Sequence, residues 1–366
     1  MCYDRKNPLK ESENNMKRTK HSPKSLSAPV REPGIDLLRC VALLFVVGVH
    51  SFLYNGFYSA PQVGSAIWPA TSFRWLFFCC NGLFMMLTGY LKTTKPFNAK
   101  YYKSLIPIMV SYTLICLLTF PIRHTLLNEK MYLAEWIKLW IQFGNYAWYL
   151  EMYIGLLLVS PALNFMMDAL KPGKQQRAAV AVAFVITALP SITTLNLVPD
   201  YWIALYPMTY YLIGAYIKRN QPKVHPASGL AVTVLTIIFL GFVSLLSTDE
   251  AFSKGFTQGY GGFWIVLITT SLFLALYRLP ISPRLAKILS WAAGGVLEGY
   301  LFSRVLDVWL YSKFPQWHTP KKYILLFLCV TIPIYLCSLL VGKLVHRITG
   351  WVMGLFAEKS KTSTRV

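Results

Sequence analysis

An arginine and a histidine lie in one apolar stretch of this chain, GIDLLRCVALLFVVGVHSFLY (residues 34–54). The stretch is long and apolar enough to cross a bilayer as a helix. Arg39 and His50 are eleven residues apart, which on a helix brings them within about 20° of one face, with a rise of about 16 Å. A guanidinium binds anionic groups, and an imidazole is a general acid or base near neutral pH. Such side chains inside a membrane need partners or a function.

The composition of the whole chain is that of an integral membrane protein. Of its 366 residues 55% are hydrophobic and 14% charged, and the mean hydropathy is +0.45, whereas a soluble domain has about a quarter charged residues. Apolar runs of about 17 to 25 residues predict an all-α, polytopic membrane helix bundle with about ten transmembrane helices. These runs lie near 35–54, 74–91, 102–121, 146–164, 177–194, 201–217, 228–247, 259–277, 289–311 and 323–346.

The basic residues predict the orientation of these helices. The net charge is +21, and the Lys and Arg residues form short tracts after the second, fourth, sixth and eighth helices and in both tails. All of these lie on one side of a ten-helix topology, and the positive-inside rule makes that side cytoplasmic. Loops on the opposite side, such as 55–73 and 191–200, contain no Lys or Arg. We therefore expect a protein of the cytoplasmic (inner) membrane with both termini in the cytoplasm.

This interpretation divides the chain into three parts. We expect residues 1–33 to be a disordered, basic cytoplasmic tail, 34–350 to be the ten-helix domain, and 351–366 to be a cytoplasmic C-terminal tail. Because the basic tracts are loop anchors between apolar runs, they do not predict a nucleic-acid partner. The seven cysteines have neither CxxC spacing nor a His at ligand distance, so they predict no metal site and no disulfide framework.

The topology also predicts the depth of the polar side chains. Asp36 and Arg39 belong near the cytoplasmic surface, and His50 belongs in the outer half of the membrane. Arg304 and Asp307, three residues apart on the ninth helix, are expected mainly to neutralise each other. Five side chains fall at comparable depth and form a candidate polar chamber in the outer half: His50, Arg74, Glu151, Arg304 and Asp307.

Structural roles compete with functional ones for these residues. Arg39 can snorkel to the inner headgroups. His50 can be packed with partners at both ring nitrogens. Glu151 and Glu298 can hold helices together as protonated or hydrogen-bonded groups. The residues alone leave these alternatives open.

The motifs, taken in order, resemble the acyltransferase 3 family of membrane-bound O-acyltransferases. IDLLRCVALLFVVGVH is similar to the family's first-helix signature and matches it at Asp36, Arg39, Ala42 and His50. The later segments RWLFFCCNGLFMMLTGYL, WYLEMYIGLLLVSPAL, YYLIGAYI and LEGYLFSRVLD resemble the following helices of the family in the same order.

The chain departs from the family pattern at three places. Thr88 stands where the family usually has Ser, and residues 146–148 read Tyr-Ala-Trp where it often has His-Leu-Trp. Ser303 stands where many members have a late His, so this chain offers no second histidine there.

The resemblance implies transfer of an acyl group, usually acetyl from acetyl-CoA, to a sugar hydroxyl of a cell-surface glycan or its lipid-linked precursor. Arg39, with Asp36 beside it, is then expected at the phosphates or thioester region of the acyl-CoA. His50 is expected as the general base on the hydroxyl. Arg74 is assigned to oxyanion or acceptor contact, and Glu151 to orienting the imidazole.

Two other functions compete with this one. A secondary transporter or permease also has ten spans and buried charges, but it predicts inverted repeats with broken helices in matching positions, and the prolines at 107, 161, 190 and 333 form no such pattern. An acyl-group translocator that serves another enzyme is the third possibility. Membrane lipid, acyl-CoA and a glycan or lipid-linked sugar are the expected partners; the sequence gives neither the acyl group, nor the acceptor hydroxyl, nor the oligomeric state.

Overall fold

The computed structural model describes residues 31–55, 57–59, 68–130, 132–192, 198–246, 259–314 and 320–363, and within these ranges the regular structure is entirely helical. The all-α prediction is therefore confirmed. The chain divides into two units, residues 1–32 and 33–366. Residues 1–30 of the predicted N-terminal tail lie outside the described ranges.

Helices account for every predicted apolar run. In the first half of the chain they are α2 (Pro33–Tyr54), α3 (Trp68–Phe77), α4 (Cys80–Lys92), α5 (Ala99–Lys103), α6 (Ile106–Leu126), α7 (Leu133–Ile141), α8 (Phe143–Ala169) and α9 (Lys174–Thr187). In the second half they are α10 (Tyr206–Asn220), α11 (Pro226–Leu246), α13 (Phe263–Leu276), α14 (Pro283–Ala293), α15 (Val296–Tyr311), α16 (Pro320–Leu326) and α17 (Ile332–Ser363). A π-helical turn, Phe327–Thr331, joins α16 to α17.

Six helical stretches in the described part of the chain are long and apolar enough to cross a membrane. They are Pro33–Tyr54, Pro69–Lys92, Ala99–Leu126, Ala147–Ala169, Pro226–Val243 and Lys322–Phe356. The remaining predicted spans correspond to α9, α10, α13 and α15, which have 14 to 16 residues each. At the other end, α17 continues as helix through Ser363, so the predicted C-terminal tail begins as part of this helix.

One predicted span is interrupted, and another begins at a bend. The second is divided into α3 and α4 by a turn at Phe78 and Cys79. The fourth begins at a bend at Ala147, whose φ of −142° and ψ of 65° are not helical. None of the residues Phe78, Cys79 and Ala147 is a Pro or Gly, the usual sequence signals for a break.

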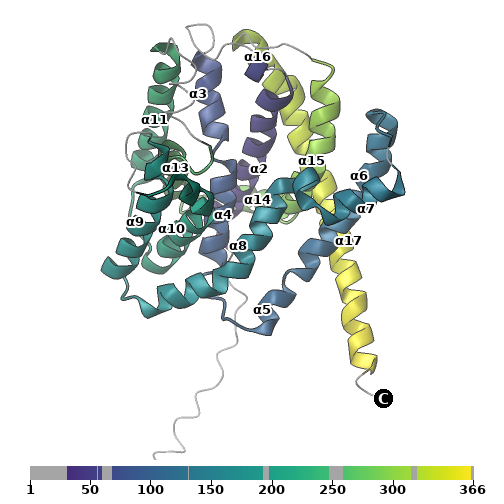
Figure 1. The fold of residues 1–366 in the computed structure, drawn as a ribbon, viewed down its shortest axis with the longest axis horizontal. Helices are drawn as coiled ribbons and strands as arrows, with labels where there is room; N and C mark the ends of the chain where they lie inside the picture. Colours follow the sequence, from purple (N-terminus) through teal and green to yellow (C-terminus); the bar gives the residue numbers. More distant parts are fainter. Residues whose placement is uncertain are drawn as a thin grey trace, which may run out of the picture. The chain divides into compact units, whose positions relative to one another are not determined.

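The first helix, α2, lies at the centre of the bundle. It packs against α3, α4, α14 and α15 (Figure 1). Leu38, Leu43 and Val47 of α2 are fully buried. A helix that is apolar on all sides is buried by neighbours on all sides, which explains why this stretch organises the elements around it.

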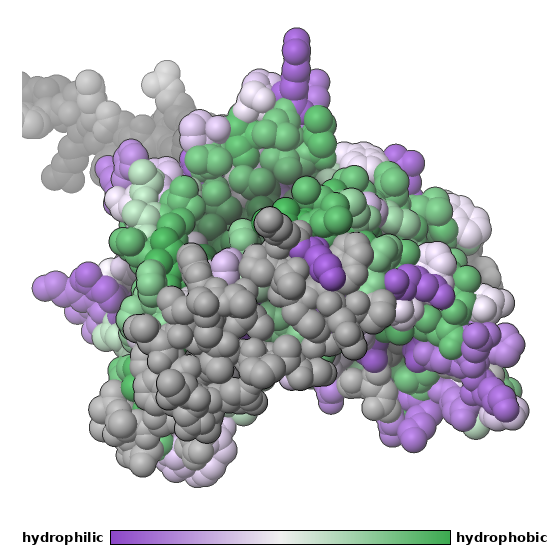
Figure 2. Space-filling model, turned by 90° about the horizontal axis from the view of Figure 1, so that it is seen from above, coloured by the Kyte–Doolittle hydropathy of each residue, from purple (hydrophilic) through white to green (hydrophobic). Residues whose placement is uncertain are grey.

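Outer helices keep large apolar side chains exposed. Leu235 of α11 is 66% exposed, Phe165 of α8 76% and Trp351 of α17 67%. Seen from above, hydrophobic residues (green) cover much of the described surface between hydrophilic groups (purple) (Figure 2). Exposed apolar surface of this kind is what a bilayer covers.

Helices α4 and α10 cross in backbone contact. A Cβ atom placed on Gly214 of α10 would lie 2.0 Å from the carbonyl oxygen of Met86, and one on Gly89 of α4 would lie 2.0 Å from that of Tyr211. Small residues let membrane helices approach this closely, and van der Waals contact between the backbones then stabilises the pair.

We expect Gly214→Val to destabilise the protein, because its side chain meets the backbone of α4 rather than a side chain that can move. Overpacking of this kind costs about 1–3 kcal/mol. The measurement is the Tm of the detergent-solubilised protein, followed by size-exclusion chromatography. Gly155→Val of α8 is the matched control, since a Cβ there has no neighbour within 4 Å; equal Tm values for the two variants would contradict the crossing.

Candidate functional site

The imidazole of His50 is held by a carboxylate from another helix. Nδ1 of His50 on α2 lies 2.6 Å from Oδ2 of Asp307 on α15. The His50 side chain is 17% exposed and the Asp307 side chain 0%. A buried carboxylate accepts the Nδ1–H bond, which fixes the ring and its tautomer and leaves the lone pair of Nε2 available to take a proton. The pair has the arrangement of a general base with an orienting acid.

Sequence reasoning predicted the depth of Asp307 but not its partner. Arg304 acts electrostatically on the Asp307 carboxylate. The hydrogen bond of this carboxylate, however, is made with His50. The orienting role was expected of Glu151, whose side chain is exposed on α8. The shared predicted depth of His50 and Asp307 was the signal that could have paired them.

At the other end of the same helix face, Arg39 is paired with Asp36. The Nη1 atom of Arg39 lies 3.3 Å from Oδ1 of Asp36, and the two side chains are 31% and 3% exposed. Because α2 is one unbroken helix from Pro33 to Tyr54, Arg39 and His50 do share a face. Asp36 holds the guanidinium, and about a third of the Arg39 side chain stays open to a ligand.

Arg74 lies in an aromatic cage in the last turn of α3. Its guanidinium carbon is 4.3 Å from the ring centroid of Trp75, 4.6 Å from that of Phe78 and 5.2 Å from that of Tyr58. Its Nε–H also donates to the Tyr58 hydroxyl at 2.9 Å. Such contacts stabilise a cation away from water. The structure thus joins His50 to Asp307 and Arg39 to Asp36, and it holds Arg74 through aromatic rings.

A second acid–imidazole pair lies on the opposite face of α15. Glu298 precedes Asp307 by nine residues, about 180° around the helix. Its Oε1 accepts from the Ser111 hydroxyl at 2.8 Å and lies 3.0 Å from Nδ1 of His346, while Ser111 contacts the Thr349 hydroxyl at 2.9 Å. These bonds join α15 to α6 and α17, as the helix-holding interpretation of Glu298 predicted. The His346 side chain is 52% exposed.

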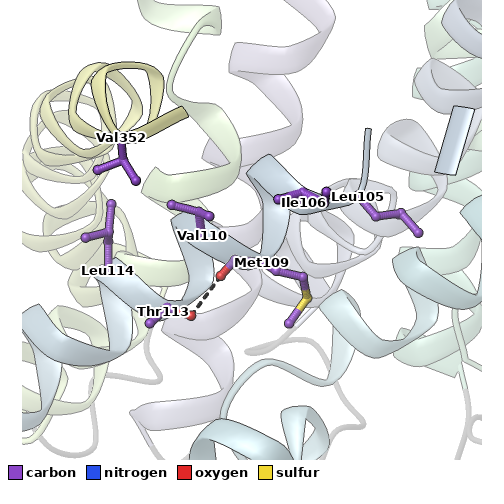
Figure 3. A pocket seen from close by; sticks show the side chains of 7 residues that line it. All are labelled: Leu105, Ile106, Met109, Val110, Thr113, Leu114 and Val352. Carbon is purple, nitrogen blue, oxygen red and sulfur yellow. Dashed lines mark hydrogen bonds between the residues drawn. The ribbon is translucent and has the colours of Figure 1, made fainter. Parts of the chain in front are cut away.

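A groove between α6 and α17 has a volume of about 430 Å³ (Figure 3). It is lined by six residues between Leu105 and Leu114 and by Val352, and Thr113 is the polar one. The Thr113 hydroxyl donates to the Met109 carbonyl at 2.9 Å. None of these side chains can act as an acid or base, so the groove is not the candidate site.

Among the residues that the structure describes, no group of three or more His, Cys, Asp or Glu side chains could hold a metal ion. Comparison with protein families gives a match to the acyltransferase domain (Acyl_transf_3) over residues 32–343. Neither the curated proteins nor the solved structures contain a match. The family match includes every residue of the candidate site.

Proposed function

Since the chain belongs to the acyltransferase family whose model it matches, we propose that it transfers an acetyl group from acetyl-CoA to a sugar hydroxyl of a cell-surface glycan or its lipid-linked precursor. The observation that carries the proposal is the His50–Asp307 pair, 2.6 Å apart, on a helix face that it shares with Arg39. That face has a base at one end and a cation at the other.

The reaction follows from the properties of these groups. The acceptor oxygen forms a bond to the thioester carbonyl carbon while Nε2 of His50 takes the hydroxyl proton. The carbon–sulfur bond then breaks, the proton passes to the departing thiolate, and the products are a sugar ester and CoA. Asp307 is a positioning residue: it holds the ring and stabilises the imidazolium that forms.

Arg39 is the proposed contact for the acyl donor. A guanidinium that is 31% exposed can bind a phosphate through two parallel hydrogen bonds. Asp36 then has a supporting role toward CoA, because it orients Arg39.

Two predicted site residues remain, Arg74 and Glu151. Arg74 is proposed for oxyanion or acceptor contact, since the rings of Trp75 and Phe78 hold its guanidinium in place. For Glu151 we propose no orienting role, because Asp307 provides it.

The protein is a multi-pass membrane protein. We propose that it lies in the cytoplasmic membrane with both termini inside and ten crossings, supported by the basic loops on one side. Arg39 then faces the cytoplasmic supply of CoA, and His50 lies about 16 Å nearer the outer surface.

We expect cells that lack the gene to lose O-acetyl groups from one surface glycan. The measurement is mass spectrometry of glycans from cells with and without the gene, and after restoring it. The restored gene should return the acetyl groups. An unchanged acetylation pattern across all surface glycans would contradict the proposal.

Binding distinguishes the rival functions. An acyltransferase is stabilised by acetyl-CoA or CoA in a concentration-dependent way, whereas a permease is stabilised by its solute. An acyl translocator would bind acetyl-CoA too, but the purified protein alone would not acetylate a sugar.

A further inference from the structure

Three tyrosine side chains from two helices pack together inside the bundle. The rings of Tyr149 and Tyr153 on α8 are stacked with centroids 6.1 Å apart, and the ring of Tyr300 on α15 meets Tyr149 edge-on at 5.5 Å. We call these three residues the tyrosine layer. None of them has a part in the proposed reaction.

The tyrosine layer lies between the two ends of the candidate site. Tyr300 precedes Asp307 by seven residues, which puts both within about 20° of one face of α15 and about 10 Å apart along it. Phe84 of α4 contacts Tyr149 with ring centroids 5.8 Å apart, and α4 packs against α2, the helix that carries Arg39. A donor that reaches from Arg39 toward the His50–Asp307 pair therefore passes this layer.

One hydroxyl of the layer has no partner among the described residues. Tyr149 is 4% exposed, and its hydroxyl oxygen makes no hydrogen bond there. A buried hydroxyl left unpaired is unfavourable, so such a group in a folded protein calls for a partner. As an O–H donor in an apolar layer, it fits an uncharged oxygen acceptor.

A second unpaired donor lies on α4. The side-chain nitrogen of Asn81 is buried without a partner among the described residues, and Asn81 is 3% exposed. Phe84, three residues further along α4, contacts the Tyr149 ring with centroids 5.8 Å apart. Two donors and no charge favour a ligand segment with carbonyl oxygens over a charged one.

We propose that the Tyr149 hydroxyl donates a hydrogen bond to a carbonyl oxygen in the pantetheine arm of the acyl-CoA. This assignment rests on the proposed function and names the part of the donor that this layer binds. The arm is a narrow, uncharged chain with amide carbonyls, and it joins the phosphates, expected at Arg39, to the thioester, expected at His50. Tyr149 is thus a binding residue between the two ends of the site.

The test is Tyr149→Phe, which removes the hydroxyl and keeps the ring. Its affinity for acetyl-CoA should fall about 2- to 10-fold, the effect of one hydrogen bond. Its affinity for adenosine 3′,5′-bisphosphate, which lacks the arm, should not change. Both are measured as Kd by ligand-dependent thermal stabilisation of the purified, full-length protein. Without ligand, the variant should unfold at or above the wild-type Tm, because an unpaired hydroxyl has been removed.

Tyr211→Phe is the matched control. Tyr211 is fully buried, and its hydroxyl already bonds Oδ1 of Asn164 at 2.7 Å, so the variant should lower the Tm and leave the Kd for acetyl-CoA unchanged. An unchanged Kd for acetyl-CoA in Tyr149→Phe would overturn the assignment while leaving the proposed function in place. An equal loss for both ligands would overturn it too, as a general effect on the fold. Failure of the wild-type protein to bind either ligand would overturn both proposals.

Discussion

Replacing His50 with glutamine is expected to lower the rate of acyl transfer by about 10²–10⁴-fold, the contribution of a general base. Glutamine can still hydrogen-bond Asp307 through its side-chain amide, so the α2–α15 contact keeps a partner, but it cannot take a proton. The measurement is kcat for transfer of radiolabelled acetyl from acetyl-CoA in membranes that contain equal amounts of protein. The KM for acetyl-CoA should stay near the wild-type value, because Arg39 is unchanged.

The matched control is His124→Gln. His124 is exposed on α6 and bonds only a backbone oxygen among its described contacts, that of Glu129 at 3.0 Å. This variant should keep wild-type kcat and Tm. A His50→Gln protein that is folded, inserted in the membrane and as active as the wild type would remove His50 from the reaction.

The second large effect is expected for Asp307→Asn, with kcat reduced about 10²–10⁴-fold. An asparagine can offer its amide nitrogen to Nδ1, which favours the tautomer that carries its proton on Nε2 and so blocks the lone pair that the reaction needs. Loss of the buried negative charge also removes stabilisation of the imidazolium. Because Asp307 acts through His50, KM for acetyl-CoA should change little while kcat falls.

Two further variants separate positioning from folding. Asp307→Glu keeps the carboxylate and should recover part of the lost kcat. Asp168→Asn is the matched control, since Asp168 is 66% exposed and paired with Arg219, away from α2. Equal kcat for Asp307→Asn and Asp168→Asn would show that the pair is structural only.

The sequence predicted the helices and the location of α2 because their signals are local. Long apolar runs, and an eleven-residue spacing on one helix, depend on the helix alone. The predicted depth of Asp307 followed from counting helices. Its hydrogen bond to His50 did not, since that depends on how α15 is turned about its axis against α2.

Side-chain packing sets the rotation of α15 about its axis. Gly299 of α15 lies against the Ser338 carbonyl of α17, 2.8 Å from where its Cβ would be, and against Leu43 of α2 at 3.2 Å. These close approaches involve α2, α15 and α17 together, so they cannot be predicted from any single stretch of sequence. The turn at Phe78–Cys79 escaped prediction because neither residue is a Pro or Gly, the usual sequence signals for a break.

The two carboxylates of α15 have a mechanical consequence. Asp307 is tied to α2 on one face, and Glu298 is tied to α6 and α17 on the other. Any rotation of α15 about its long axis would stretch bonds on both sides together, so the helix has little torsional freedom. The angle at which Asp307 meets the imidazole is thereby fixed from a point about 13 Å away along the helix, on the side that faces away from the reaction.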